Sequence, residues 1–226
     1  GTFSDTWGRG LMLRAYEART ATVGRVERSL ALDRDVDGVR LRGRYGAARV
    51  TVLSGRPQLT PVSGSPDEAP AGRRDRIRGA RVEADVTSNV QAAGSFLRIN
   101  GPGFSGGTAR DEFSSLAISG DTGGFDGLVE VGHRSDNPDL FIHSGDAIYA
   151  SLGYSTGPFA FTAEVKDYEQ FLSPYNEPPT LVKSHTWTLL NRQTHVSNPD
   201  DEVGYQAEGS WSPDPESGLT LNHSRS

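Results

Sequence analysis

The chain has 226 residues, a formal net charge of −6 and no cysteine. This length allows one large or two small domains. Without cysteine there are no disulfides, thiolate zinc sites or cysteine nucleophiles, and the lack of a basic excess argues against nucleic-acid binding. The hydrophobic share of 35% and the 27 glycines disfavour a helical bundle. They suit a turn-rich β protein, or one with polar side chains in its interior.

No run of about twenty apolar residues is present, so the sequence predicts no transmembrane helix. Membrane β-barrels are not excluded by this, because their strands are short and only half apolar. The chain begins at Gly1 without a signal peptide and ends with "LNHSRS" inside an alternating pattern. We expect residues 1–226 to be a single domain and a truncated piece of a longer protein.

Alternation of apolar and polar residues with a period of two is the most frequent pattern and predicts β-strands. It is clearest over residues 39–45, where Arg40, Arg42 and Arg44 alternate with apolar residues and glycine. The same pattern recurs over 48–54, 80–87, 90–97, 147–154, 159–166 and 202–211, and more weakly over 9–17, 112–119, 125–133, 185–192 and 218–224. This makes roughly a dozen strands, without any capped helix of three turns.

The connections between these strands alternate between long and short as far as residue 193. The short connections are 46–47, 88–89, 120–124 and 155–158, and Gly46-Ala47 is predicted to be a tight hairpin turn. The long connections, rich in Gly, Pro, Asp and Ser, are 18–38, 56–78, 100–111, 134–145 and 169–184. Outer-membrane barrels have this order, with short periplasmic turns and long outer loops.

The two faces of the predicted strands favour a membrane barrel over a soluble sandwich. The apolar face carries many small residues, which lipid accommodates better than a packed core does. Aromatic residues lie near strand ends, as in an interfacial girdle: Tyr45, Tyr154, Phe159, Tyr168 and Trp211. We therefore predict an all-β fold, an antiparallel up-and-down meander that forms all or part of a transmembrane β-barrel. A soluble β-sandwich or jelly roll gives the same alternation and is the alternative.

The stretch GPGFSGG, residues 101–107, matches two chemical motifs in letters alone. As GxGxxG it lacks the following helix that dinucleotide binding requires. As GxSxG, with Ser105 as the nucleophile, it lacks the strand-to-helix elbow of a serine hydrolase. A Gly/Ser loop is the better interpretation.

Asp33, Asp35 and Asp37 are spaced like the start of a calcium loop. The twelfth position of that loop is Arg44 instead of the bidentate glutamate, so an EF-hand is excluded and an irregular calcium site is the remaining option. The histidines lack metal-binding helical spacing, and paired carboxylates on one strand face are interpreted as wall charges. We expect no enzyme activity and no cofactor.

Three segments resemble one family of proteins. "DTWGRGLMLRAYEAR" (5–19) resembles the opening of a strand in large, uncharacterised outer-membrane β-barrel proteins of Gram-negative bacteria. "LDRDVDGVRLRGRYGAARVTVLSGRP" (32–57) is similar to the hairpin that follows it there, and 176–211 is similar to a later segment. The resemblance implies a porin-like barrel of the bacterial outer membrane without an assigned substrate, in a protein longer than this chain.

The expected function is the passage or binding of small polar solutes through a charged lumen, with the lipid bilayer as the second partner. The alternative is a soluble module that binds carbohydrate or protein. The lumen-facing candidates are Arg40, Arg42, Arg44, Arg49, Arg81, Glu83, Asp85, Glu164, Lys166, Glu202 and Glu208. Arginines of 39–49 facing carboxylates elsewhere would set a transverse field across such a pore. No nucleic-acid partner is expected, and the oligomeric state is not predicted.

Overall fold

A computed structural model of the chain describes residues 1–15, 36–57, 75–102, 107–136, 143–173, 175–176, 178–179, 201–214 and 216–225. All regular elements in these ranges are β-strands. Within the same ranges, no helix has the length and apolar character needed to cross a membrane.

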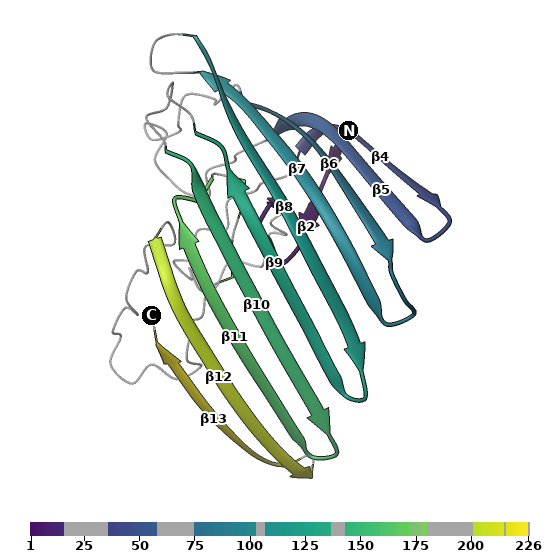
Figure 1. Ribbon diagram of the computed structural model, residues 1–226, viewed down its shortest axis with the longest axis vertical. Helices are drawn as coiled ribbons and strands as arrows, with labels where there is room; N and C mark the ends of the chain where they lie inside the picture. Colours follow the sequence, from purple (N-terminus) through teal and green to yellow (C-terminus); the bar gives the residue numbers. More distant parts are fainter. Residues whose placement is uncertain are drawn as a thin grey trace.

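Eleven strands form one antiparallel sheet. From edge to edge they are β1 (Thr2–Phe3), β4 (Val36–Tyr45), β5 (Ala48–Pro57), β6 (Arg76–Asp85), β7 (Val90–Pro102), β8 (Thr108–Thr122), β9 (Phe125–Arg134), β10 (Gly145–Thr156), β11 (Phe159–Glu169), β12 (Asp201–Asp214) and β13 (Ser217–Arg225). From β4 onward each strand pairs with the next one in the chain, so the predicted up-and-down meander is confirmed (Figure 1). The described sheet curls but stays open, with β13 at one edge and β1 and β4 at the other.

The sheet has a turn end, where short connections join successive strands, and a loop end, where longer connections do. The hairpin turn predicted at Gly46-Ala47 joins β4 to β5. Gly46 has a φ of 57°, a left-handed conformation that glycine adopts without strain. The weakly patterned stretches 112–119, 125–133 and 218–224 are strands as well, whereas 185–192 lies outside the described residues.

The predicted connections at the loop end are too long. β7 continues to Pro102 and β8 already begins at Thr108, although 100–111 was expected to be a connection. In the same way β5 reaches Pro57 and β6 begins at Arg76, within the connection expected at 56–78. Near the loop end the outward side chains become charged and the inward ones apolar, so the apolar–polar pattern changes phase while the strands remain paired.

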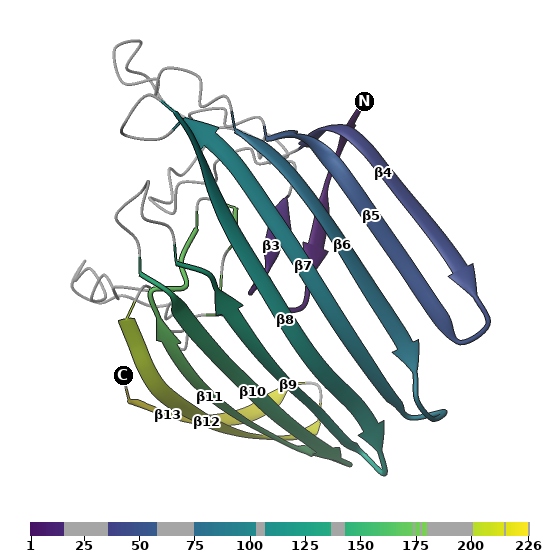
Figure 2. The same ribbon diagram turned by 45° about the horizontal axis from the view of Figure 1, so that its top comes forward.

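The strand predicted for residues 9–17 is confirmed only in part, and residues 16–17 lie outside the described residues. Only Leu13–Ala15 of this stretch is described as a strand, β3, and it pairs with β2 (Asp5–Trp7) in a separate small sheet. This hairpin lies on the concave face of the large sheet (Figure 2). We call residues 5–15 the N-terminal plug.

The buried core lies between the plug and the loop-end half of the concave face. Trp7 and Leu11 of the plug pack in one cluster with Leu97, Phe113 and Phe171. This close packing requires a glycine at position 79 of β6, because a Cβ there would lie 2.6 Å from the Trp7 ring. The core therefore fixes the plug against the sheet.

Candidate functional site

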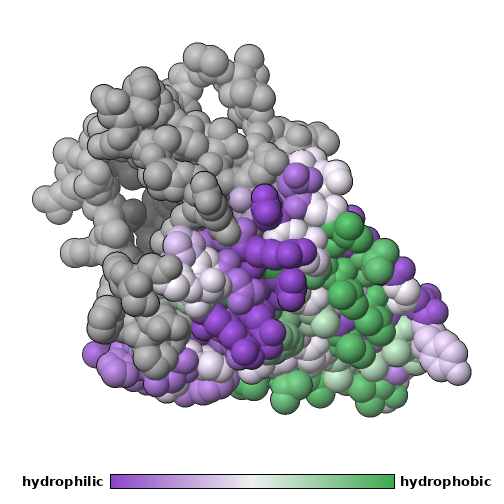
Figure 3. Space-filling model, turned by 90° about the horizontal axis from the view of Figure 1, so that it is seen from above, coloured by the Kyte–Doolittle hydropathy of each residue, from purple (hydrophilic) through white to green (hydrophobic). Residues whose placement is uncertain are grey.

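The convex face of the sheet is apolar over its turn-end half. Leu116 is 68% exposed on this face, and Figure 3 shows hydrophobic residues gathered along the outside of the sheet. No described segment packs over them. This apolar band contains Val39, Leu41, Val50, Val52, Val82, Phe96, Leu116, Ile118, Val129, Val131, Ile148, Leu152, Phe161, Val165, Val203, Leu219 and Leu221.

Aromatic residues line the turn end of the apolar band. Tyr45, Phe125, Tyr154, Phe159 and Trp211 all lie beside the short turns. The rings of Phe125 and Tyr154 are 4.3 Å apart between centroids, and Phe159 is the cross-strand neighbour of Trp211. Four of the five aromatics predicted for a girdle are in this row.

Tyr168 was assigned to the girdle and belongs elsewhere. Its side chain lies on the concave face, is 1% exposed, and donates a hydrogen bond to the Pro179 carbonyl. Apolar side chains change from the convex to the concave face between Val165 and Tyr168, so a constant phase along the strand predicts the wrong side.

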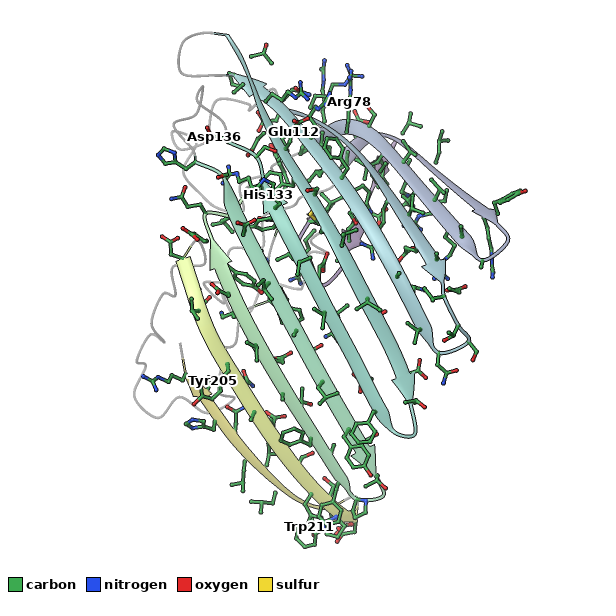
Figure 4. All side chains as sticks on the ribbon, in the orientation of Figure 1. Arg78, Glu112, His133, Asp136, Tyr205 and Trp211 are labelled. Atoms are coloured by element: carbon green, nitrogen blue, oxygen red, sulfur yellow. The ribbon has the colours of Figure 1, made fainter. Side chains whose placement is uncertain are left out.

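Charged side chains border the apolar band at the loop end of the convex face. Those on β6 to β8 are basic apart from Glu112, and we call the four arginines Arg76, Arg78, Arg98 and Arg110 the basic rim. Those on β10 to β12 are acidic: Asp146, Asp167, Glu169 and Asp201, the acidic rim. Figure 4 shows Arg78, Glu112 and His133 near this end and Trp211 at the opposite end. The rim is therefore divided by sign of charge.

Glu112 is the carboxylate within the basic rim. One of its oxygens accepts hydrogen bonds from Arg98 Nε and from Arg110 Nη2, each 2.6 Å long. Burial on its own raises the pKa of the Glu112 carboxyl, but the bonds from Arg110 and Arg98 outweigh it and hold the pKa below its usual 4.5. Glu112 thus stays ionised and fixes the positions of two rim arginines.

The concave face is polar over the turn-end half of the sheet. All eleven lumen candidates project from this face, and the cross-strand register brings them together in two groups. The first group, on β4 to β6, is Arg40, Arg42, Arg44, Arg49, Arg81, Glu83 and Asp85. The second, on β11 and β12, is Glu164, Lys166, Glu202 and Glu208.

Most cations of the first group have a carboxylate nearby. Arg49 lies 3.5 Å from Asp85 and 3.9 Å from Glu83, and Arg81 lies 3.3 Å from Glu83. Arg44 donates to the Gly46 carbonyl at 3.3 Å and has no carboxylate partner among the described residues. Carboxylates next to these arginines therefore cancel part of the positive charge that was expected to produce a transverse field.

Asp5 of the plug is a member of the site that the sequence interpretation missed. Both of its carboxylate oxygens accept bonds of 3.0 Å from Arg42, and Arg40 lies 3.5 Å away. Between the plug and β4 to β6 there is a polar cavity of about 660 Å³, lined by Asp5, Arg42, Arg44, Arg49, Arg81 and Glu83 among others. The sequence analysis assigned residues 9–17 to a strand of the barrel and did not place the residues before them in the interior. The role of Asp5 was therefore not predicted.

The second group is tightly paired. Lys166, which is 0% exposed, forms an ion pair with Glu202. Glu164 accepts a hydrogen bond of 2.8 Å from the Tyr149 hydroxyl, and the Asn222 amide donates to Glu208 at 3.0 Å. This side of the concave face is predominantly anionic.

Glu130 of β9 was not singled out from the sequence, although it is fully buried on the concave face. It accepts a hydrogen bond of 3.0 Å from Ser115, and a Cβ at Gly8 of the plug would collide with its carboxylate. Glu130 therefore marks the point where the plug turn meets strand β9 of the large sheet.

The structure does not support a catalytic site at Ser105 or a calcium site at Asp33, Asp35 and Asp37. Ser105, Asp33 and Asp35 lie outside the described residues, and Asp37 is an exposed group on the convex face. Among the described residues no cluster of His, Asp or Glu could hold a metal ion.

The comparisons with known proteins give one family. No curated protein and no solved structure matches the chain. A family model described as a family of unknown function, DUF6029, matches residues 1–221. The chain therefore belongs to the DUF6029 family.

Proposed function

We propose that this sheet is part of the wall of an outer-membrane β-barrel whose polar interior binds or passes small polar solutes. The observation that carries the proposal is the inverted turn-end half, polar on the concave face and apolar on the convex face. Four outward residues of β10, from Ile148 to Tyr154, form a row about 20 Å long at about 3.4 Å per residue. Apolar bands of outer-membrane barrels are about 25 Å tall and carry aromatic girdles.

The polar cavity beside the plug is the proposed solute site. Four arginines line it against two carboxylates, Asp5 and Glu83, so the balance of charge favours an anion. Arginine rings select anions in pores by the same electrostatics. The plug narrows the concave space, so solutes are proposed to bind or pass beside it.

The membrane claim is tested by single-cysteine spin labels, because the chain contains no cysteine of its own. Labels at Leu116, Ala117, Ile118 and Ser119 should alternate in lipid vesicles. We expect the labels at 116 and 118 to be relaxed by oxygen and those at 117 and 119 by a water-soluble nickel complex. A label at Arg110 is the control and should contact water. Uniform contact with water at 116–119 would exclude a membrane wall.

The solute claim is tested in planar bilayers. Arg40→Glu together with Arg42→Glu should shift ion selectivity towards cations. Arg44→Glu should shift it in the same direction without touching Asp5, which separates the effect of charge from loosening of the plug. Unchanged selectivity of a conducting protein in both variants would contradict the assignment.

The second candidate is a soluble module that binds carbohydrate or protein. It is favoured by the loop-end half, where Phe113 and Leu97 are buried as in an ordinary soluble core. A refolded chain that stays monomeric without detergent would support this candidate over the membrane wall.

A further inference from the structure

The basic rim has an excess of positive charge spread over three neighbouring strands. Arg78 of β6 and Arg98 of β7 are direct cross-strand neighbours on the convex face, and Arg110 of β8 holds the same side. Glu112 is the carboxylate among them, and it binds Arg98 and Arg110. Arg76 and Arg78 form no ion pair with any residue that the structure describes. The patch therefore holds four cations against one anion.

An apolar groove begins directly below this patch. Its volume is about 730 Å³, and its walls include Ala80, Val82, Gly94, Phe96, Leu116 and Val131. Two residues down the strands from Arg78 and Arg98 lie Ala80 and Phe96, about 7 Å nearer the turn end. The groove is hollow because small residues stand at Ala80 and Gly94.

We propose that the basic rim binds the phosphate headgroup of a membrane lipid, with one acyl chain lying in the groove below it. The inference rests on the proposed function, since it requires lipid around the apolar band. Guanidinium groups bind phosphate oxygens in pairs of charge-assisted hydrogen bonds. The acidic rim on β10 to β12 repels the same headgroup. Its Asp146 also lines the groove, where the carboxylate lies 2.8 Å from His133 Nδ1, so the headgroup is held at the β6 to β8 side of the groove. Charge and apolar groove thus match the two parts of one amphiphile.

The test uses detergent-solubilised full chain titrated with dioleoyl phosphatidic acid and followed by native mass spectrometry. Replacing Arg76, Arg78 and Arg98 by Gln should weaken binding about fivefold per arginine. The control in the acidic rim, Asp167→Asn with Glu169→Gln, removes charges of the opposite sign and should leave binding unchanged or strengthen it. Equal binding by the arginine variant and the parent would overturn the proposal.

The groove is tested by Gly94→Leu, which fills it. A Cβ at Gly94 would meet Leu116 Cδ2 at 3.5 Å, an ordinary contact, so the variant should fold. The matched control is Gly127→Leu in a second apolar groove of the convex face, where the nearest atom to a Cβ is 3.7 Å away. Gly94→Leu should lower phosphatidic acid binding and Gly127→Leu should not. Equal effects would overturn the groove assignment.

Three further probes separate the sources of a bound anion. Dioleoylglycerol, which has the same chains without phosphate, should bind much more weakly than phosphatidic acid. Inorganic phosphate that displaces the lipid at equal concentration would indicate a free-anion site, and a glutamate-rich peptide that binds more tightly would indicate a protein partner; both would overturn the lipid assignment. If the spin labels show a membrane wall but the arginine variant binds lipid normally, only the lipid site fails.

Discussion

The loop-end half of the sheet has buried apolar residues such as Leu97 and Phe113 on its concave face and charged residues on its convex face. The turn-end half has charged residues on its concave face and exposed apolar residues on its convex face. Both halves belong to the same strands, and the reversal occurs within one strand after another. In β8 the apolar positions shift from Ala109 and Phe113, which face inward, to Leu116 and Ile118, which face outward. One continuous strand therefore has its apolar residues on the concave face near the loop end and on the convex face near the turn end.

The difference teaches that a strand can keep its alternation and still exchange its faces. The loop-end half has an ordinary protein core, stabilised by burial between sheet and plug. The turn-end half leaves its large apolar side chains outside, which is stable only if something apolar covers them. The two halves should therefore respond differently to substitutions on the same strand.

The largest expected effect separates the two halves on β8. Phe113→Ala should lower the free energy of unfolding by about 3–5 kcal/mol, because a fully buried ring is removed. Phe113 also packs edge-on to Phe171, with ring centroids 5.4 Å apart. Leu116→Ala on the exposed side should cost well under half as much. Urea unfolding in phosphatidylcholine vesicles measures both; equal losses would remove the distinction.

The next prediction concerns two positions on the convex side of β11. Ala163→Arg should destabilise the protein by about 2–4 kcal/mol in a bilayer, since it places a charge on the lipid face midway between Phe161 and Val165 of the apolar band. Asp167→Arg, four positions further along the same face, should change stability by less than about 0.5 kcal/mol because it lies in the acidic rim. The measurement is again unfolding from vesicles. A small effect at Ala163 would contradict the position of the apolar band.

A third prediction tests the plug, which touches both halves. Gly8→Ala should lower stability by about 2–3 kcal/mol, because the residue has a φ of 62° and its new Cβ would displace Glu130. Gly46→Ala is the matched control: its φ is 57°, but no atom lies within 4 Å of the added Cβ. It should lose only about 1 kcal/mol from backbone strain. Equal losses in the unfolding midpoint would show that the plug does not press on Glu130.

The smallest effect is expected at Glu112 in the basic rim. Its pKa is lower in the folded protein than the ordinary 4.5, so its pairing stabilises the fold fully above that value. This contribution, about 0.2–1 kcal/mol for an ion pair near the surface, is lost as the pH falls through the lowered pKa. Glu112→Gln should abolish this part of the pH dependence. Identical stability curves of parent and variant between pH 6 and about pH 3 would contradict it.

The sequence predicts the meander well because side-chain alternation and short turns are local features. Ten strands of one sheet follow from them, from β4 to β13, and the glycine of Gly46-Ala47 marks one turn directly. The loop-end strand segments escaped prediction because they carry arginine on one face and isolated apolar residues on the other, as in Arg76-Ile77-Arg78. Alternation is present there, but in the opposite phase.

Only part of the candidate site could be predicted from the sequence. The charged positions of β4, β5 and β6 are on one face because a constant period places them there. Asp5 and Glu130 join them only through curvature and the return of the plug, which no local pattern encodes. The basic rim was likewise hidden, because Arg76, Arg78 and Arg110 fell into stretches expected to be connections and Arg98 lay just past the predicted strand 90–97.

The plug has a consequence for the order of folding. Its residues are made before those of β4 to β13 of the sheet, yet the amide of Asn176 donates to the carbonyl of Leu11 across 165 positions of sequence. Gly8 in turn meets Glu130 on β9, so the segment cannot reach its final place until most of the sheet exists. Contacts of such sequence separation slow folding, because a long loop must close before any of them forms. The plug therefore docks late in folding, after the strands on which it packs have paired.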